Sequence, residues 1–215
     1  MERRAFLQTS VASGVTLWLG RDLTGCSTAA VRTSGPAPAS SYVTPPARRP
    51  GNWDPVDYNL QRGAAGFISE SYMGKIRDVD GIAKHLGKHL PYVVKAPERL
   101  EPGLLPLAWG DPSKGHAKHP NAPRSADNPE GHWYDWIRIA PEGEPAEEVI
   151  TRFDNWPNTT TGLLLGMDGG DPADDSGKNT VYIPRRPVST KSGDWVRIWA
   201  HCLTHGEYVD FVQIP

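Results

Sequence analysis

The chain has 215 residues, two cysteines and a formal net charge of −2. This length is sufficient for one globular domain with a core of its own. The nearly balanced charge and the lack of a basic tract exclude the electrostatic footprint of a nucleic-acid-binding protein, and two cysteines exclude a four-thiolate zinc or iron centre. We therefore expect small molecules or proteins as partners, and no nucleic acid.

Residues 1–25 have the features of an export signal. Arg3 and Arg4 precede an apolar run that is too short to span a bilayer as a helix. The paired arginines resemble a twin-arginine signal, and the closing "LTGC" resembles the lipobox of bacterial lipoproteins. These features predict a protein that is exported to the periplasmic side of a bacterial membrane and anchored there by a lipid on Cys26.

Residues 26–52 are rich in Pro, Ala and Ser and have no apolar period. This composition is typical of a tether rather than of a packed element. We therefore assign residues 53–215 to the globular domain. A disulfide between Cys26, which precedes this tether, and Cys202, which lies in a strand-like run near the C-terminus, is disfavoured.

From residue 53 onward, short strand-like runs alternate with turn signals. Aromatic and β-branched residues are concentrated in the runs, and Gly, Pro, Asn and Asp lie between them. The six best runs cover residues 89–97, 132–141, 161–167, 179–188, 194–203 and 207–214. Residues 69–87 instead predict a short helix. The pattern predicts an all-β fold, an antiparallel β-sandwich with a short helical segment before most of its strands.

Two acidic segments rich in helix and strand breakers cover residues 140–149 and 167–179. The second carries four carboxylates that could bind calcium, namely Asp168, Asp171, Asp174 and Asp175. Their spacing differs from that of a twelve-residue helix-flanked calcium loop, and no glutamate closes the segment. We interpret this segment as a solvated hairpin loop.

A thiol and an imidazole lie three residues apart near the C-terminus, at Cys202 and His205. A strand that turns at Gly206 can direct both side chains toward one point, because glycine lets the backbone bend tightly. Three further histidines lie at the starts of predicted strands or in the loops before them, namely His89, His119 and His132. A thiolate with neutral imidazoles suits Zn, Fe or Cu rather than Mg or Ca. These five side chains therefore predict a transition-metal site.

The remaining histidines have simpler explanations. His201 directly precedes Cys202, so on a strand it should point to the opposite face. His85 fits the surface of the predicted helix, and His116 lies in a loop rich in Gly and Lys. The exchange that the sequence leaves most open is His116 for His119 as a ligand.

The ordered set of motifs resembles the superoxide reductase family, which includes neelaredoxin and the catalytic module of desulfoferrodoxin. Members carry Lys-His-x-Pro, then His-Pro with a second His four residues before a Trp, then Cys-x-x-His-Gly. Here these motifs are Lys88–Pro91, His119–Pro120, His132 with Trp136, and Cys202–Gly206. The resemblance covers roughly residues 80–215. It implies an immunoglobulin-like sandwich with one mononuclear non-haem iron, four histidines in a plane and the cysteine sulfur on the axis.

The resemblance also implies an oxidoreductase that detoxifies superoxide by reducing it to hydrogen peroxide. Lys88 is then the candidate catalytic residue, because its ammonium can attract the anion and help to deliver a proton. An external electron donor protein would re-reduce the iron, and the sequence does not identify it. Two alternatives remain: an exported metal-binding or electron-transfer sandwich without this activity, and a scaffold without metal. The oligomeric state, including a homo-oligomer, is left open.

The chain departs from the family pattern at two points. The loop between His119 and His132 is longer than the tight spacing of the family, so His119 could be displaced from the site. Gly87 stands where many members have a glutamate that can occupy the open iron position. The sequence therefore leaves the sixth iron ligand unidentified.

Overall fold

The computed structural model describes residues 44–76, 84–95, 100–153, 164–166 and 180–215. These residues all belong to one compact unit, Pro38–Pro215. The predicted export signal with Cys26 and the acidic segment 167–179 lie outside the described residues. Among the described helices, none is long and apolar enough to cross a membrane.

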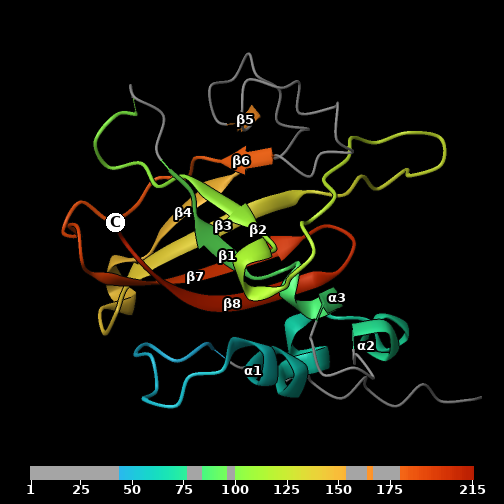
Figure 1. Ribbon diagram of the computed structural model, residues 1–215, viewed down its shortest axis with the longest axis horizontal. Helices are drawn as coiled ribbons and strands as arrows, with labels where there is room; N and C mark the ends of the chain where they lie inside the picture. The colour runs from blue at the N-terminus through green and yellow to red at the C-terminus, as the bar shows by residue number, and fades with distance from the viewer. Residues whose placement is uncertain (1–43, 77–83, 96–99, 154–163, 167–179) are drawn as a thin grey trace, which may run out of the picture. The chain divides into compact units, whose positions relative to one another are not determined.

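Within the described residues, two antiparallel sheets of four strands each pack against a shared core (Figure 1). The first sheet has the order β1-β2-β6-β5, with β1 (Pro91–Val93), β2 (Leu107–Trp109), β6 (Thr180–Tyr182) and β5 (Leu164–Gly166). The second has the order β4-β3-β7-β8, with β4 (Val149–Arg152), β3 (Tyr134–Pro141), β7 (Trp195–Cys202) and β8 (Gly206–Gln213). This architecture confirms the predicted all-β sandwich.

The core between the sheets follows from the alternation of side chains along the long strands. One face of β7 is buried in this core and carries Val196, Ile198, Ala200 and Cys202. Leu107 and Tyr182 enter the same core from the first sheet. Burial of one large apolar side chain stabilises the fold by about 1.5–3 kcal/mol. The core therefore fixes the end of β7, where Cys202 lies.

Short helices precede the first strand, namely α1 (Pro55–Arg62), α2 (Glu70–Ile76) and α3 (Lys84–Gly87). The last two fall in residues 69–87, where the sequence predicts a short helix. A second apolar cluster, the helical cluster, contains side chains from these helices and from β8, namely Ile68, Tyr72, Met73, Ile76, Leu86, Leu90 and Tyr208. The helices are thus packed on the sandwich through Tyr208.

One α-helix and two strands among the described residues were not predicted from the sequence. The α1 helix begins at Asp54, whose carboxylate accepts hydrogen bonds from the N–H groups of Val56 and Asp57 at 2.8 and 3.1 Å. Strand β2 has only three residues, too few to show a period of two. Strand β4 starts at Val149, the last residue of the acidic segment 140–149, whose composition gives no strand signal.

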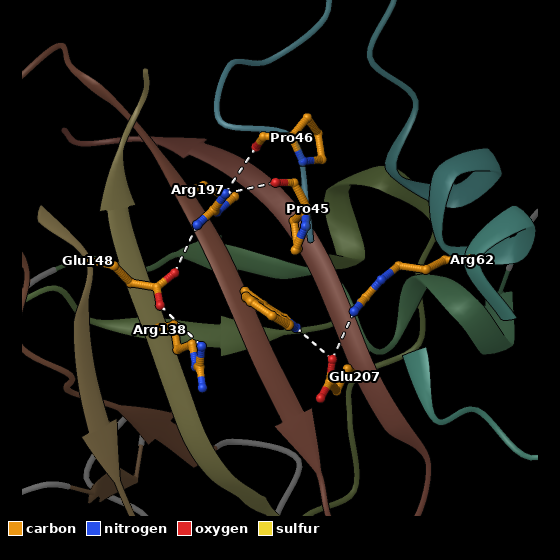
Figure 2. Close-up of polar contacts among 8 residues, drawn as sticks. Pro45, Pro46, Arg62, Arg138, Glu148, Arg197 and Glu207 are labelled. Atoms are coloured by element: carbon orange, nitrogen blue, oxygen red, sulfur yellow. Dashed lines mark hydrogen bonds and ion pairs between the residues drawn. The ribbon is translucent and has the colours of Figure 1, made fainter. Parts of the chain in front are cut away.

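Residues 44–53 lie against the outer face of the second sheet. Arg197 Nη1 donates hydrogen bonds to the backbone carbonyls of Pro45 and Pro46 at 3.0 and 3.2 Å (Figure 2). Trp53 Nε1 donates to Asp210 Oδ1 on β8 at 2.8 Å. Contacts of the folded body therefore extend to Pro45, inside the segment 26–52 that its composition assigns to the tether.

A buried ion pair and several hydrogen bonds fasten α1 to the β7–β8 hairpin. Arg62 Nη2 at the end of α1 donates to Glu207 Oε2 at 2.8 Å (Figure 2). Trp199 Nε1 donates to the same oxygen at 2.9 Å. The side-chain amide of Asn59 pairs with both backbone groups of Val209, at 2.7 and 2.9 Å. These contacts cover the edge strand β8 and hold the helices beside the hairpin turn.

Candidate metal centre

Segments far apart in the sequence bring the predicted ligands to neighbouring strand ends. His89 lies two residues before β1, and the N–H of His119 donates to the carbonyl of Trp109 at the end of β2, at 3.1 Å. His132 lies two residues before β3, whose first residue pairs with Cys202. The strand ends of both sheets thus position these side chains.

The hairpin turn places the thiol and the last histidine together. Cys202 and Gly206 form the last pair between β7 and β8, and His205 lies in the turn that joins them. Gly206 has φ +88°, and a Cβ on it would lie 2.6 Å from the carbonyl oxygen of Gly66. Only glycine fits this turn, because the backbone before α2 approaches it closely.

The long loop after His119 does not displace that residue. Ala122 and His132 exchange two backbone hydrogen bonds of 2.8 Å, which close the loop at its base. The imidazole rings of His119 and His132 consequently remain near each other, with centroids 4.3 Å apart. The extra residues lie beyond this closure, so the expectation that the longer loop could displace His119 was wrong.

The side chains of His89, His119, Cys202 and His205 form one mostly buried group whose ligand atoms all lie within 4.8 Å of one another. Cys202 Sγ lies 3.5 Å from His119 Nε2 and 3.8 Å from His205 Nδ1. His132 lies beside this group, with its Nε2 3.0 Å from His205 Nδ1. The structure thus brings all five predicted ligands into one neighbourhood, four of them within a single group.

These distances fit ligation of one ion. Nitrogen and sulfur ligands bind a transition metal such as zinc at about 2.0–2.3 Å, so two of them lie roughly 3 Å apart at a right angle and roughly 4.5 Å apart on opposite sides. The separations of 3.0, 3.5 and 3.8 Å fall in this range. The group can therefore hold a metal ion.

Partners outside the group fix which nitrogen of two histidines carries the lone pair. His119 Nδ1 lies 3.1 Å from Asn121 Oδ1, which is only an acceptor, so Nδ1 carries the proton and Nε2 faces Cys202. His89 Nδ1 lies 3.2 Å from the hydroxyl of Tyr134, which donates to the His89 carbonyl and so accepts from Nδ1. The Nε2 lone pair of each histidine is therefore available to a metal.

Burial keeps the imidazoles neutral. It lowers the pKa of His89 and His119 well below the usual value, with neighbouring histidines and Lys88 adding to the effect. Burial and the charge of Lys88 lower the pKa of His132 to about 4, and burial with His132 lowers that of His205 to about 3. Neutral imidazoles are the form that binds a metal.

The pKa of the Cys202 thiol shifts in the opposite direction. Burial raises the pKa of Cys202 to about 12, although the backbone N–H groups of Thr204 and His205 and the charge of Lys88 oppose the rise. The sulfur is fully buried and carries a proton when no cation is beside it. A metal that binds there must displace that proton.

Lys88 lies next to the group. Its ammonium Nζ is 5.6 Å from the centre of the Tyr72 ring, and burial lowers its pKa. Its charge also lowers the pKa of His132 and opposes the rise in the pKa of Cys202. The predicted catalytic lysine is thus close enough to act electrostatically on the predicted ligands.

The other histidines lie outside the group. The ring of His116 packs on Gly87, where an added Cβ would lie 2.3 Å from His116 Cδ2. His201 faces away from Cys202, because its Nδ1 bonds to Asp135 Oδ1 and its ring stacks on Trp136. His85 is exposed. The described geometry therefore brings His119, and not His116, to the thiol.

Several residues around the group had no signal in the sequence. Asn121 orients His119 and accepts a hydrogen bond from the hydroxyl of Tyr182. The ring of Tyr208 stacks on His89 with centroids 4.3 Å apart. The ring of Tyr72 stacks on His205 at 3.8 Å. No spacing rule connects these residues with the histidines, since only the tertiary fold brings them together.

Solved structures that resemble this chain include superoxide reductases of low similarity. A neelaredoxin variant from Ignicoccus hospitalis is 16% identical over 68% of this chain and 98% of that chain, with a TM-score of 0.27. A neelaredoxin variant from Archaeoglobus fulgidus in the reduced form is 18% identical over 60% of this chain and 89% of that chain, with a TM-score of 0.29. The superoxide reductase from Nanoarchaeum equitans is 15% identical over 60% of this chain and 94% of that chain, with a TM-score of 0.27. No family model and no curated protein matches the sequence. Similarities of this size do not assign a function.

Proposed function

We propose that this chain binds one mononuclear non-haem iron and reduces superoxide to hydrogen peroxide. The proposed ligands are His89, His119, His132, Cys202 and His205. The observation that carries the proposal is the meeting of a buried thiol with imidazoles from separate segments, at distances that suit one ion. Such ligands suit iron, zinc or copper, and the order of the motifs, which resembles the superoxide reductase family, favours iron among them.

The reaction consumes one electron and two protons for each superoxide anion. When bound, ferrous iron would supply the electron, and the thiolate of Cys202 would tune its potential. The chain contributes the ammonium of Lys88 and a mostly buried group of ligands. The ammonium of Lys88 would attract the anion and pass a proton from Nζ to the product, while water supplies the second proton. Burial lowers the pKa of Lys88, which makes it the stronger acid.

The export signal and the lipobox support a second part of the proposal. The domain would stand on the periplasmic side of a bacterial membrane, held by a lipid on Cys26, with an external electron donor protein as its partner. A homo-oligomer is compatible with this arrangement.

The proposal is tested with purified protein loaded with iron. We expect one iron per chain, a thiolate-to-iron absorption band in the oxidised protein, and loss of that band in Cys202→Ser. A superoxide pulse should oxidise the reduced protein and yield hydrogen peroxide. An iron-loaded protein that shows the band but does not consume superoxide would support the alternative function, electron transfer or metal binding. A chain that binds no transition metal would contradict both functions.

A further inference from the structure

The hydroxyl of Tyr72 occupies the lone pair that a metal would use on His89. Tyr72 Oη lies 2.9 Å from His89 Nε2. Because His89 Nδ1 donates to Tyr134, Nε2 is the acceptor and Tyr72 is the donor. The hydroxyl of Tyr72 therefore lies where the lone pair of this ligand atom points.

Tyr72 reaches the histidines from a different part of the fold than Cys202. Its side chain is buried in the helical cluster, and its ring stacks on His205 with centroids 3.8 Å apart and planes 17° apart. Cys202 belongs to the core between the sheets. The histidines thus lie between a thiol supplied by the sandwich and a phenol supplied by α2.

Metal binding would change the partner of this phenol. A metal about 2.0–2.1 Å from His89 Nε2 takes the lone pair, so the hydrogen bond from Tyr72 is lost and its hydroxyl moves away from this position. The stacking on His205 and the packing of α2 keep the ring beside the group. The hydroxyl, which comes from the helical cluster while the thiol comes from the core between the sheets, can then donate to an anion bound at the metal.

Two neighbours strengthen this assignment. The Lys88 ammonium lies 5.6 Å from the centre of the Tyr72 ring, so a positive charge and the hydroxyl belong to the same region of the site. Gly87 offers no side chain, and the ring of His116 fills the space where its Cβ would lie. Tyr72 is thus the polar group from the helical side that reaches the histidines.

We propose that Tyr72 is a direct anion-binding residue of the metal centre, whose hydroxyl donates a hydrogen bond to a small anion bound at the metal. This inference rests on the proposed metal site. It does not depend on superoxide reductase activity, because the same contact would serve any small anion. The ligand class is a compact anion with an exposed acceptor atom, such as superoxide or azide.

The test uses the full chain loaded with cobalt(II). The absorption spectrum of bound cobalt(II) reports both sulfur ligation and anion binding without any turnover. Azide is titrated into wild-type protein and into Tyr72→Phe. We expect the azide dissociation constant to rise about tenfold in Tyr72→Phe, the loss of one hydrogen bond. Cobalt affinity should stay equal or increase, because the metal no longer displaces a hydrogen bond.

The matched control is Tyr208→Phe. Tyr208 stacks on His89, but its hydroxyl donates to the backbone carbonyl of His205 at 3.0 Å. This variant removes a hydroxyl from the same neighbourhood and should leave azide affinity unchanged. Equal azide affinity in wild type and Tyr72→Phe would overturn the inference alone, and a tenfold loss of cobalt affinity would instead make Tyr72 a ligand. Failure of the wild type to bind cobalt or iron would overturn the metal site itself.

Discussion

Asp210 offers a stability prediction with a definite sign. Its side chain is 4% exposed, and its Oδ1 accepts hydrogen bonds from Trp53 Nε1 at 2.8 Å and from the N–H of Phe211 at 2.7 Å. Burial nevertheless raises the pKa of Asp210 from 3.8 to about 6, against these two hydrogen bonds and the charges of Lys114 and Arg49. The charged form of this carboxyl therefore destabilises the folded protein.

The magnitude follows from proton linkage. The pKa of Asp210 is higher in the folded protein than in the unfolded chain. Its contribution to the free energy of unfolding is therefore fully present below about pH 4 and is lost as the pH rises through 6. Two pKa units correspond to roughly 3 kcal/mol. Asp210→Asn keeps the acceptor for Trp53 and Phe211 and removes the charge, so it should relieve this penalty at pH 7.5 and not at pH 4.

The assay is urea denaturation of wild type and Asp210→Asn between pH 4 and 8. The introduced amide N–H groups carry a cost that does not depend on pH, so the change in ΔΔG with pH is the informative quantity. We expect the variant to gain roughly 3 kcal/mol relative to wild type between pH 4 and 7.5. Asp57→Asn, which removes an exposed carboxylate from α1, is the matched control. A ΔΔG for Asp210→Asn that stays constant with pH would show that the folded protein does not raise the pKa of Asp210.

Three further predictions concern the site. Lys88→Ala should slow the second-order reaction with superoxide and flatten its dependence on ionic strength, whereas Lys191→Ala, which lies before the start of β7, should change neither. Stopped-flow or pulse measurements at several salt concentrations test this, and an unchanged rate and slope in Lys88→Ala would remove Lys88 from the mechanism. Gly206→Ala should destabilise the fold by at least about 1–3 kcal/mol, because a side chain at φ +88° meets the carbonyl of Gly66; a normal melting temperature would show that the turn tolerates a Cβ. Metal uptake should release one proton at pH 7, because burial raises the pKa of Cys202 to about 12; calorimetry in buffers of different ionisation enthalpy measures it, and Cys202→Ser should abolish the release.

Much of the sandwich could be predicted because its long strands display their burial in the sequence. Strand β7 alternates between the core and the outer face, so its period of two is visible over eight residues. Strand β2 is equally buried but has three residues, and nothing local distinguishes it from a loop. The α1 helix had a readable start at Asp54–Pro55, yet its eight residues contain few apolar positions.

The candidate site was predictable only in its chemistry-bearing residues. The spacing of Cys202 and His205, together with histidines at strand ends, suggested a shared position in space. The closure of the long loop by Ala122 and His132 could not be predicted, because it depends on a bridge between residues ten apart. The same holds for Tyr72, which reaches the site through the packing of α2 on the hairpin.

The central claim is that one metal ion is bound by the sulfur of Cys202 together with imidazole nitrogens. X-ray absorption spectroscopy of the iron-loaded protein tests it most directly, because the scattering of the nearest shell distinguishes sulfur from nitrogen and oxygen. We expect one sulfur and four imidazole nitrogens around a single iron, with the sulfur lost in Cys202→Ser. A nearest shell made only of light atoms in the wild-type protein would contradict it.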